Sequence, residues 1–570
     1  MSADGNINPS TEADTDRPDG GSEAVINTSN AESDNDQDQP QTRNEDQQVP
    51  GGPSVKCVVF CALLSAIGGM ILGYNQGINA VTLVLPQFLE QFPEVPRETT
   101  VYKGLLPTIV IFGALFGAMN QGWIADKISR RKSIVWAVGI FMAGSAIQTA
   151  SLNHKMLISG RVFGGLGIGM LSMVAPLYIS EISPPKIRGL LLVLQEFSIV
   201  VGIISSTSIT YGTKNKPGNP SWQIPFGLQL IPGLVLGLGA FFIPYSPRWL
   251  AAKGRDEEAL EALARLNKLP EDDPDVRKEW LEILVEVAFQ KEVLENRSSD
   301  VVAPRTTWEK LELKLRICPW TNLFRSACRK RTWVAFGLMF LQQFAGTNAL
   351  IYYAPTFFEN LGVDNRMQLL LPTFLQLTQL GGVATSLWTV DHFGRKPVLL
   401  VGSSGMLISH IVIAILIRKN SANWPSHSKA SVAGVVFLFA YMFLFGASWG
   451  PIPWAMPAEI FPSPLRAKGV AFSTFSHWLC NLAIGFLTPL LIQKTGYGVH
   501  VFFAVWCLLS IPWTTVFVKE TRGETLETMD ELFQDRGTAT CVEMKNQIRN
   551  RIQAKFGQGY ELDDLTNPVD

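Results

Sequence analysis

The chain has 570 residues, of which 47% are hydrophobic and only 17% are charged, and its formal net charge is −1. Soluble proteins usually contain about 25% charged residues, so the deficit excludes an ordinary soluble globular protein. The net charge itself indicates no partner, and we expect neither a nucleic-acid partner nor a cofactor.

The first 54 residues differ sharply from the rest of the chain. They contain 12 acidic residues, 2 basic residues and no aromatic residue. Such a segment cannot bury enough apolar surface to offset the entropy lost on ordering, so residues 1–54 are predicted to form a disordered acidic tail. The segment also lacks a basic start followed by an apolar core, so it does not fit a cleaved signal peptide.

The remaining sequence repeats apolar runs of roughly 20 residues, the length at which a helix crosses about 30 Å of hydrocarbon. We therefore predict an all-α membrane protein with twelve transmembrane helices. The predicted spans are 56–78, 104–124, 133–152, 156–179, 190–212, 222–244, 333–353, 368–390, 396–417, 432–455, 467–491 and 498–518.

Basic residues concentrate in alternate loops, among them 126–132, 184–189, 391–397 and 464–469. The positive-inside rule places these loops and both termini in the cytosol. The stretch 246–332 then forms a cytosolic linker, in which 255–266 and 279–293 carry apolar residues at helical spacing and predict amphipathic helices. Residues 519–570 form a cytosolic C-terminal tail.

Two charged motifs occur once in each half of the chain. Asp126-Lys-Ile-Ser-Arg130-Arg131 corresponds to Asp391-His-Phe-Gly-Arg395-Lys396, and Glu181 precedes Arg188 by seven residues, as Glu459 precedes Arg466. This duplication predicts two pseudo-symmetric six-helix bundles, 55–245 and 333–518. The charged groups would form a cytosolic gate that separates when a cleft opens. Simple charge balance in the loops is the alternative.

The sequence shows no pattern typical of a metal site, a catalytic site or a disulfide framework. The seven cysteines have no CxxC spacing, and no metal-ligand cluster, catalytic constellation or nucleophile elbow occurs. Structural disulfides are not expected.

Six longer stretches carry a further signal: GRVFGGLGIGMLSMVAPLYISEISPPKIRG (160–189), PYSPRWL (244–250), QQFAGTNALIYYAP (342–355), VDHFGRKP (390–397), WGPIPWAMPAEIFPSPLRAKG (449–469) and KETRGETLETMDE (519–531). Together they resemble the sugar porter branch of the major facilitator superfamily, and in particular fungal hexose transporters. The resemblance implies alternating access, a sugar site at the midplane between the halves, and Glu520 as a further gate residue. The glycines at 164, 165, 167 and 169 are assigned to close helix packing.

The resemblance also implies which residues contact the sugar. Amides both donate and accept hydrogen bonds, as sugar hydroxyls do, and an indole face can stack on a pyranose. The alternative for such amides is hydrogen bonding between helices. The predicted contacts are Glu196, Gln342, Gln343, Asn348, Tyr352, Gln379, Trp454 and His477, with Tyr353 completing the tyrosine pair of this motif.

Three of these contacts depart from the family pattern. Glu196 stands where Gln is usual, unless the alignment is shifted by one residue and Gln195 is the ligand. Gln379 replaces an Asn, and His477 replaces an Asn or Gln. An intramembrane carboxylate indicates a functional site by default, either as a protonated donor or paired with His477 or Arg161. Tyr245 also stands where Glu is common in the PxSPR motif.

In GYNQGINA (73–80), Asn75 occupies the position of the coupling Asp of proton-linked sugar porters, whose partner corresponds to Arg161. Because Asn75 cannot titrate, the sequence predicts facilitated diffusion of a hexose or pentose. The alternative is proton-coupled symport of a sugar, polyol or sugar acid through Glu196. A non-transporting nutrient sensor is the alternative of another class. The expected partners are a sugar and membrane lipid, with protons as a further partner in the symport alternative, and the expected location is the fungal plasma membrane.

Overall fold

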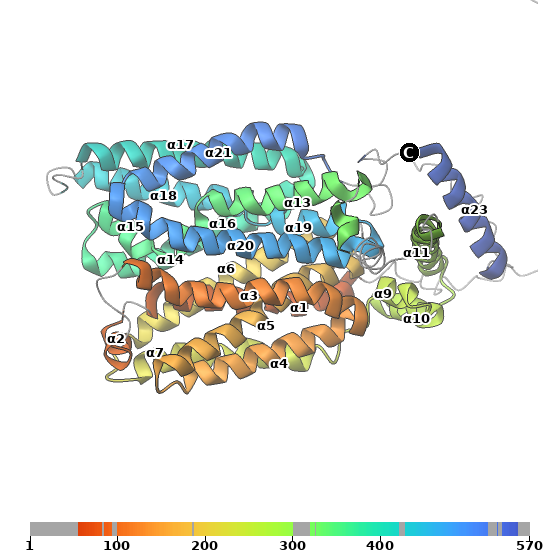
Figure 1. Ribbon diagram of the computed structural model, residues 1–570, viewed down its shortest axis with the longest axis horizontal. Helices are drawn as coiled ribbons and strands as arrows, with labels where there is room; N and C mark the ends of the chain where they lie inside the picture. The colour runs from red at the N-terminus through yellow and green to blue at the C-terminus, as the bar shows by residue number, and fades with distance from the viewer. Residues whose placement is uncertain are drawn as a thin grey trace, which may run out of the picture. The chain divides into compact units, whose positions relative to one another are not determined.

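All regular secondary structure in the described part of the chain is helical (Figure 1). The structure, a computed structural model, describes residues 55–82, 85–93, 100–184, 187–299, 320–324, 326–420, 424, 428–522, 533 and 538–556. The predicted acidic tail, 1–54, lies outside these residues.

The first part of the chain forms eleven described helices. They are α1 (Val55–Thr82), α2 (Pro86–Gln91), α3 (Thr100–Ile128), α4 (Arg130–Thr149), α5 (His154–Ile182), α6 (Arg188–Thr213), α7 (Pro220–Leu228), α8 (Leu230–Gly239), α9 (Pro247–Ala252), α10 (Asp256–Asn267) and α11 (Pro274–Ser299).

After the 3₁₀ turn η2 (Thr321–Phe324), the described helices continue to residue 556. They are α13 (Ser326–Phe344), α14 (Thr347–Tyr352), α15 (Ala354–Asn360), α16 (Asn365–Phe393), α17 (Arg395–Asn420), α18 (Ser428–Ala447), α19 (Ile452–Ile460), α20 (Ser463–Thr495), α21 (Gly498–Phe517) and α23 (Thr538–Phe556).

Ten helical segments of the described residues are long and apolar enough to cross a membrane. The predicted spans 133–152 and 368–390 are helices α4 and α16 but fall outside that set. Their composition explains why, because α4 begins with Arg130-Arg131-Lys132 and α16 carries several amides along its 29 residues. Each of the twelve predicted spans therefore coincides with helical structure, and the all-α membrane fold is confirmed.

Three spans predicted as continuous are broken helices. The span 222–244 divides at Gln229, 333–353 divides at Ala345–Gly346, and 432–455 divides between Ala447 and Ile452. Gly346 has φ of +100°, a conformation that favours glycine and ends a right-handed helix. Between α18 and α19 the sequence is Ser-Trp-Gly-Pro451, and a proline lacks the N–H that would continue the helix.

Small residues allow the first helices to approach closely. A Cβ at Gly169 would lie 2.0 Å from the carbonyl oxygen of Ala114 on α3, and a Cβ at Gly167 would lie 2.6 Å from the backbone nitrogen of Phe141 on α4. The packing role predicted for this glycine run is therefore supported at α5. Gly73 is equally close, since its Cβ would lie 1.8 Å from the carbonyl oxygen of Ile199 on α6.

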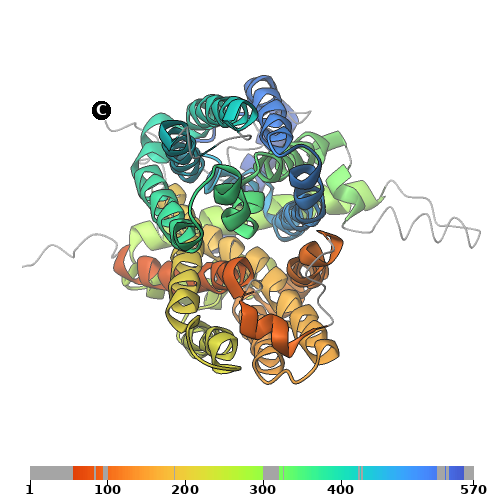
Figure 2. The same cartoon turned by 90° about the vertical axis from the view of Figure 1, so that its left-hand side faces the viewer.

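The helices contact one another in two groups. In one group α1 packs on α6 and α5 packs on α3 and α4, while in the other α16 and α17 pack on α18 and α13 packs on α20. Between the groups the main contacts are α3 with α20 and α6 with α16. Figure 2 shows the red-to-yellow helices and the green-to-blue helices on opposite sides of this seam. The domain boundaries given above stay a prediction, and we call the groups the first and second halves.

The helices α9, α10 and α11 pack on a small core of their own, which includes Trp249, Leu263 and Trp280. Trp249 Nε1 also donates to the carbonyl of Asp126 at the end of α3, at 3.1 Å. We call the end of the bundle where α3, α5, α16 and α19 finish the linker end (Figure 1).

A helix within the predicted C-terminal tail packs on the linker. In α23, Lys545 forms an ion pair with Glu286 on α11 at 3.3 Å, and Ile548 is buried beside Val285 and Phe289. The predicted tail therefore contains a folded element, whose basic and apolar residues match an acidic and apolar face of α11.

Reversing one charge of this contact should loosen α23. In Lys545→Glu, two carboxylates would face each other, so we expect amide hydrogen exchange in the segment 285–289 to accelerate by roughly 5-fold, consistent with about 1 kcal/mol for a partly exposed ion pair. The double variant Lys545→Glu/Glu286→Lys should restore the protection. Unchanged exchange in the single variant would contradict this packing.

Candidate substrate site

Polar side chains from both halves line one cavity of the described structure. The described lining residues are Leu72 and Gln76 on α1, Glu196, Ile199 and Ile203 on α6, Gln342 and Gln343 on α13, Thr347, Asn348 and Ile351 on α14, Gln379 on α16, Phe445 on α18, Trp454 on α19 and His477 on α20. Seven of the eight predicted contacts are among them.

Three amides of the second half, Gln342, Gln343 and Asn348, form one hydrogen-bonded cluster with His477. Asn348 Nδ2 donates to Gln343 Oε1 at 2.7 Å, and Gln343 Nε2 lies 2.9 Å from His477 Nδ1. Gln342 Oε1 lies 3.1 Å from the same His477 nitrogen, while Gln342 Nε2 donates to the carbonyls of Trp449 and Gly450. Because one imidazole nitrogen either donates or accepts, the tautomer of His477 selects which glutamine it binds.

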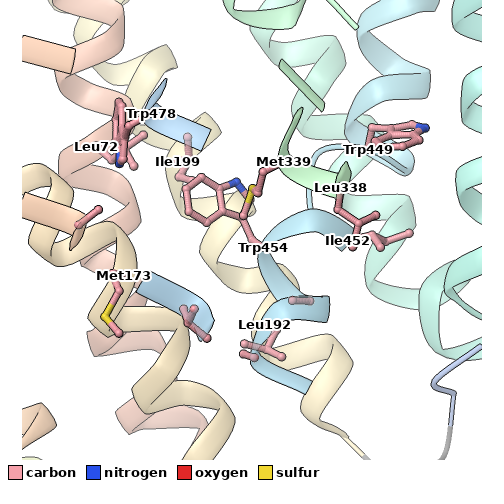
Figure 3. Close-up of a cluster of buried hydrophobic side chains, with 14 of the residues drawn as sticks. Leu72, Met173, Leu192, Ile199, Leu338, Met339, Trp449, Ile452, Trp454 and Trp478 are labelled. Atoms are coloured by element: carbon pink, nitrogen blue, oxygen red, sulfur yellow. The ribbon is translucent and has the colours of Figure 1, made fainter. Parts of the chain in front are cut away.

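An aromatic surface lies beside this cluster. The rings of Trp454 and His477 have centroids 4.6 Å apart. Figure 3 shows Trp454 at the centre of the buried cluster, with Leu72 and Ile199 on one side of it and Met339 on the other. The broken span places Trp454 on the short helix α19, directly after the proline-rich break. The cavity thus offers an indole ring and a set of hydrogen-bonding groups together.

Glu196 connects the two halves through the cavity wall. Its Oε1 accepts a hydrogen bond from Gln379 Nε2 at 3.4 Å, so two of the three departures from the family pattern contact each other. Among the described residues, neither His477 nor Arg161 is its partner. Gln195 is fully buried against Gly69 and does not line the cavity. The residue that faces the cavity is therefore Glu196.

Tyr352 is the predicted contact that does not line the cavity. Its hydroxyl accepts from Asn481 Nδ2 on α20 at 3.3 Å. Tyr353 instead donates to the carbonyl of Gly485 at 2.9 Å. Sequence reasoning missed Gln76 and Thr347 as lining residues. Gln76 lies next to Asn75, and its polarity within an apolar span was the available signal.

Asn75 and Arg161 are linked through a third residue. Arg161 Nη1 donates to Asn79 Oδ1 at 2.7 Å, and Asn79 Nδ2 lies 3.4 Å from Asn75 Oδ1. Both asparagines are on α1, one turn apart. A neutral amide therefore receives the hydrogen bond from the buried guanidinium, and Asn75 is the next residue in the chain of contacts.

The paired charged motifs form matching ion pairs at the linker end. Arg130 contacts Glu181 at 2.8 Å and Asp126 at 3.2 Å. In the second half, Arg395 contacts Glu459 at 3.1 Å and Asp391 at 3.3 Å. Both arginines and both glutamates have side chains that are at most 6% exposed. The motif that recurs in the sequence of both halves thus forms the same arrangement of one arginine and two carboxylates in each half.

The aspartates of these motifs also reach the opposite half. Asp391 Oδ2 accepts from the backbone N–H of Leu190 in the first turn of α6, at 3.1 Å, where the helix dipole favours a negative charge. Asp126 Oδ2 contacts Lys468 Nζ on α20 at 2.8 Å. These two contacts hold the halves together at the linker end.

The remaining predicted gate residues have other partners. Glu520 accepts from the backbone N–H groups of Arg395 and Lys396 at the start of α17. Arg188 and Arg466 donate to the carbonyls of Ser183 and Phe461.

Arg131 does not contact a carboxylate of the described residues. It donates to the carbonyl of Phe241 at 2.7 Å and lies over the ring of Tyr245, with 5.1 Å between the guanidinium carbon and the ring centroid. Tyr245, the departure in the PxSPR motif, therefore still binds an arginine of the predicted gate.

The cavity suits a neutral polyhydroxylated molecule. None of the described lining residues is a lysine or arginine, and amides provide most of the polar groups. No group of three or more metal-ligating side chains occurs among the described residues.

Comparison with known proteins identifies what the chain is similar to. The family described as "Sugar (and other) transporter" matches residues 61–533. A quinate permease of Neurospora terricola is 31% identical over 86% of this chain and 91% of its own length. A probable glucose transporter of Neurospora crassa is 29% identical over 84% of this chain and 79% of its own length. The fold matches the proton:xylose symporter XylE bound to 6-bromo-6-deoxy-D-glucose, with a TM-score of 0.70, 22% identity and coverage of 84% of this chain and 99% of that one.

Proposed function

This chain belongs to the sugar porter family of the major facilitator superfamily, and from that premise we propose that it transports a neutral monosaccharide, a hexose or a pentose, by alternating access and facilitated diffusion. Sugar porters are membrane transporters rather than enzymes, and the chain is a multi-pass integral membrane protein. We place it in the plasma membrane with both termini and the linker end in the cytosol, because the basic loops lie at that end.

The observation that carries the proposal is the cavity rich in amides and without a cation. Gln342, Gln343, Asn348, Gln379 and His477 can donate to and accept from hydroxyl groups, the carboxyl group of Glu196 can accept from them, and Trp454 can stack on a pyranose. A carboxylate substrate such as quinate would enter a site that holds Glu196 and no described lysine or arginine. Burying an unpaired charge is costly, so the site favours neutral substrates.

Alternating access is supported by the contacts between the halves at the linker end. At the linker end, the bonds of Asp391 and Asp126 to the opposite half must break for the cavity to open there. Substrate binding to residues of both halves supplies the differential affinity that such a change requires.

A test of the substrate class uses cells that lack hexose carriers. Expressing this chain should restore uptake of labelled D-glucose or D-xylose, and excess unlabelled quinate should leave that uptake unchanged. Uptake of quinate without uptake of either sugar would reject the neutral-substrate proposal. Surface expression without any uptake would favour the nutrient sensor.

Proton-coupled symport of a sugar, polyol or sugar acid is the second candidate. One observation favours it: Glu196 is a buried carboxyl group in the cavity wall, and its contact with Gln379 spans the two halves. Adding or removing a proton there changes the charge of the site during the transport cycle. Asn75 and Asn79 argue for the facilitator, since neither amide beside Arg161 can titrate.

A further inference from the structure

A side-chain network lies behind the break between α13 and α14. The carbonyl of Ala345 falls outside both helices and accepts two hydrogen bonds, from Tyr441 Oη on α18 at 2.8 Å and from His410 Nε2 on α17 at 3.1 Å. The hydroxyl of Thr347, the first residue of α14, lies 2.9 Å from Tyr441 Oη. All of these side chains are buried.

The positions of the protons in this network follow from the chemistry of its members. A carbonyl oxygen only accepts, so the single hydroxyl proton of Tyr441 points to Ala345. The proton in the contact between Tyr441 and Thr347 must then come from Thr347. Thr347 has one hydroxyl proton, and the network uses it.

A histidine pair supports the same arrangement. His410 Nε2 must carry a proton to donate to Ala345, so in the neutral imidazole its Nδ1 is an acceptor. His500 Nδ1 on α21 lies 3.2 Å from that atom and therefore donates to it. Side chains of three helices, α17, α18 and α21, thus hold Ala345 and Thr347 in one hydrogen-bonding state.

We propose that Thr347 is a specificity-determining residue that offers the substrate only a hydrogen-bond acceptor, because its hydroxyl proton is donated to Tyr441 Oη. The inference rests on the proposed sugar site, which Thr347 lines between Gln343 and Asn348. The substrate hydroxyl that meets Thr347 must donate. A fluorine at that position cannot donate and would face a lone pair, so it gains nothing over a hydrogen atom.

The test compares sugar analogues on purified full-length protein. Whichever of D-glucose and D-xylose binds more tightly is compared with its monodeoxy and monofluoro analogues by the change in tryptophan fluorescence. At one ring position, the deoxy and fluoro analogues should both bind roughly 10-fold more weakly than the parent sugar, the loss of one buried hydrogen bond. Thr347→Val should abolish the difference in affinity between the parent sugar and its analogues at that position, and Thr347→Ser should keep this difference.

Tyr441→Phe provides the decisive comparison. It frees the proton of Thr347, so the fluoro analogue at that position should bind about 3-fold or more tightly than the deoxy analogue, whereas the two are equal in the parent protein. Tyr178→Phe is the matched control, since it also removes a buried tyrosine hydroxyl bonded to a carbonyl, that of Pro244, 2.8 Å away and outside the cavity. In Tyr178→Phe the fluoro and deoxy analogues should bind with equal affinity, as in the parent protein.

Each of the other outcomes would contradict one part of the inference. If Thr347→Val retains the discrimination at every position, Thr347 does not contact the sugar and the inference is wrong. If Thr347→Val abolishes it but Tyr441→Phe leaves the two analogues equal, Tyr441 does not set the proton of Thr347. If the parent protein binds neither D-glucose nor D-xylose, the proposed function fails first, and this inference fails with it.

Discussion

Replacing Arg395 by methionine is expected to lower the maximal rate of sugar uptake roughly 100-fold. The guanidinium compensates two carboxylates, Glu459 and Asp391, and its side chain is 6% exposed. Removing one partner of a buried ion pair costs about 3–5 kcal/mol because the other charge stays buried without compensation. Asp391 would also lose the contact that orients it towards the N–H of Leu190, so closure at the linker end would become unfavourable.

The measurement is initial uptake at saturating sugar, divided by the amount of protein at the cell surface. Arg418→Met is the matched control, since Arg418 lies in the last turn of the same helix, α17, and is exposed. Among the described residues it contacts only the ring of Tyr497. It should transport at the parent rate. An Arg395→Met protein with parental uptake per molecule would contradict the role of this ion pair in closure.

The second large effect is expected on substrate affinity. Gln343→Leu should weaken sugar binding at least 100-fold, because it removes a proposed substrate partner and leaves Asn348 Nδ2 and His477 Nδ1 without one of their bonds. Each buried polar group left unsatisfied costs about 1–3 kcal/mol. Binding is measured by equilibrium titration of the purified protein.

Gln121→Leu is the control for this variant. Gln121 is a fully buried amide on α3, outside the cavity, and neither its Oε1 nor its Nε2 has a hydrogen-bond partner among the described residues. Its replacement should leave the affinity unchanged. Equal affinities of the parent and Gln343→Leu proteins would show that the sugar does not bind at this cluster.

Sequence patterns predicted the parts of the molecule that depend on repeated local chemistry. Apolar length located the spans, and the duplicated acid–base spacing predicted that the two halves would carry corresponding charged groups. In the structure Arg130 and Arg395 each lie beside an aspartate one turn earlier and a glutamate of another helix, a pairing that the spacing did not specify. These contacts are set by helix geometry and by motifs that recur in both halves.

Features that depend on tertiary geometry were not accessible in the same way. The break at Gly346 lies in an apolar run that reads as one span, and its consequence for Thr347 depends on Tyr441, 94 residues away. Spacing also could not show that Asn79 rather than Asn75 receives the bond from Arg161, since both lie on the same helix one turn apart. Likewise, α23 is stabilised by its packing on α11, which local composition does not reveal.

Sugar uptake into proteoliposomes, with and without a proton gradient, tests facilitated diffusion most directly. With the purified protein reconstituted and labelled D-glucose or D-xylose outside, we expect uptake to stop at equal concentrations on both sides, with or without an imposed proton gradient. Glu196→Gln should behave in the same way. Accumulation of sugar above equilibrium when the outside is acidic, lost in Glu196→Gln, would contradict facilitated diffusion and identify Glu196 as the proton-coupling residue.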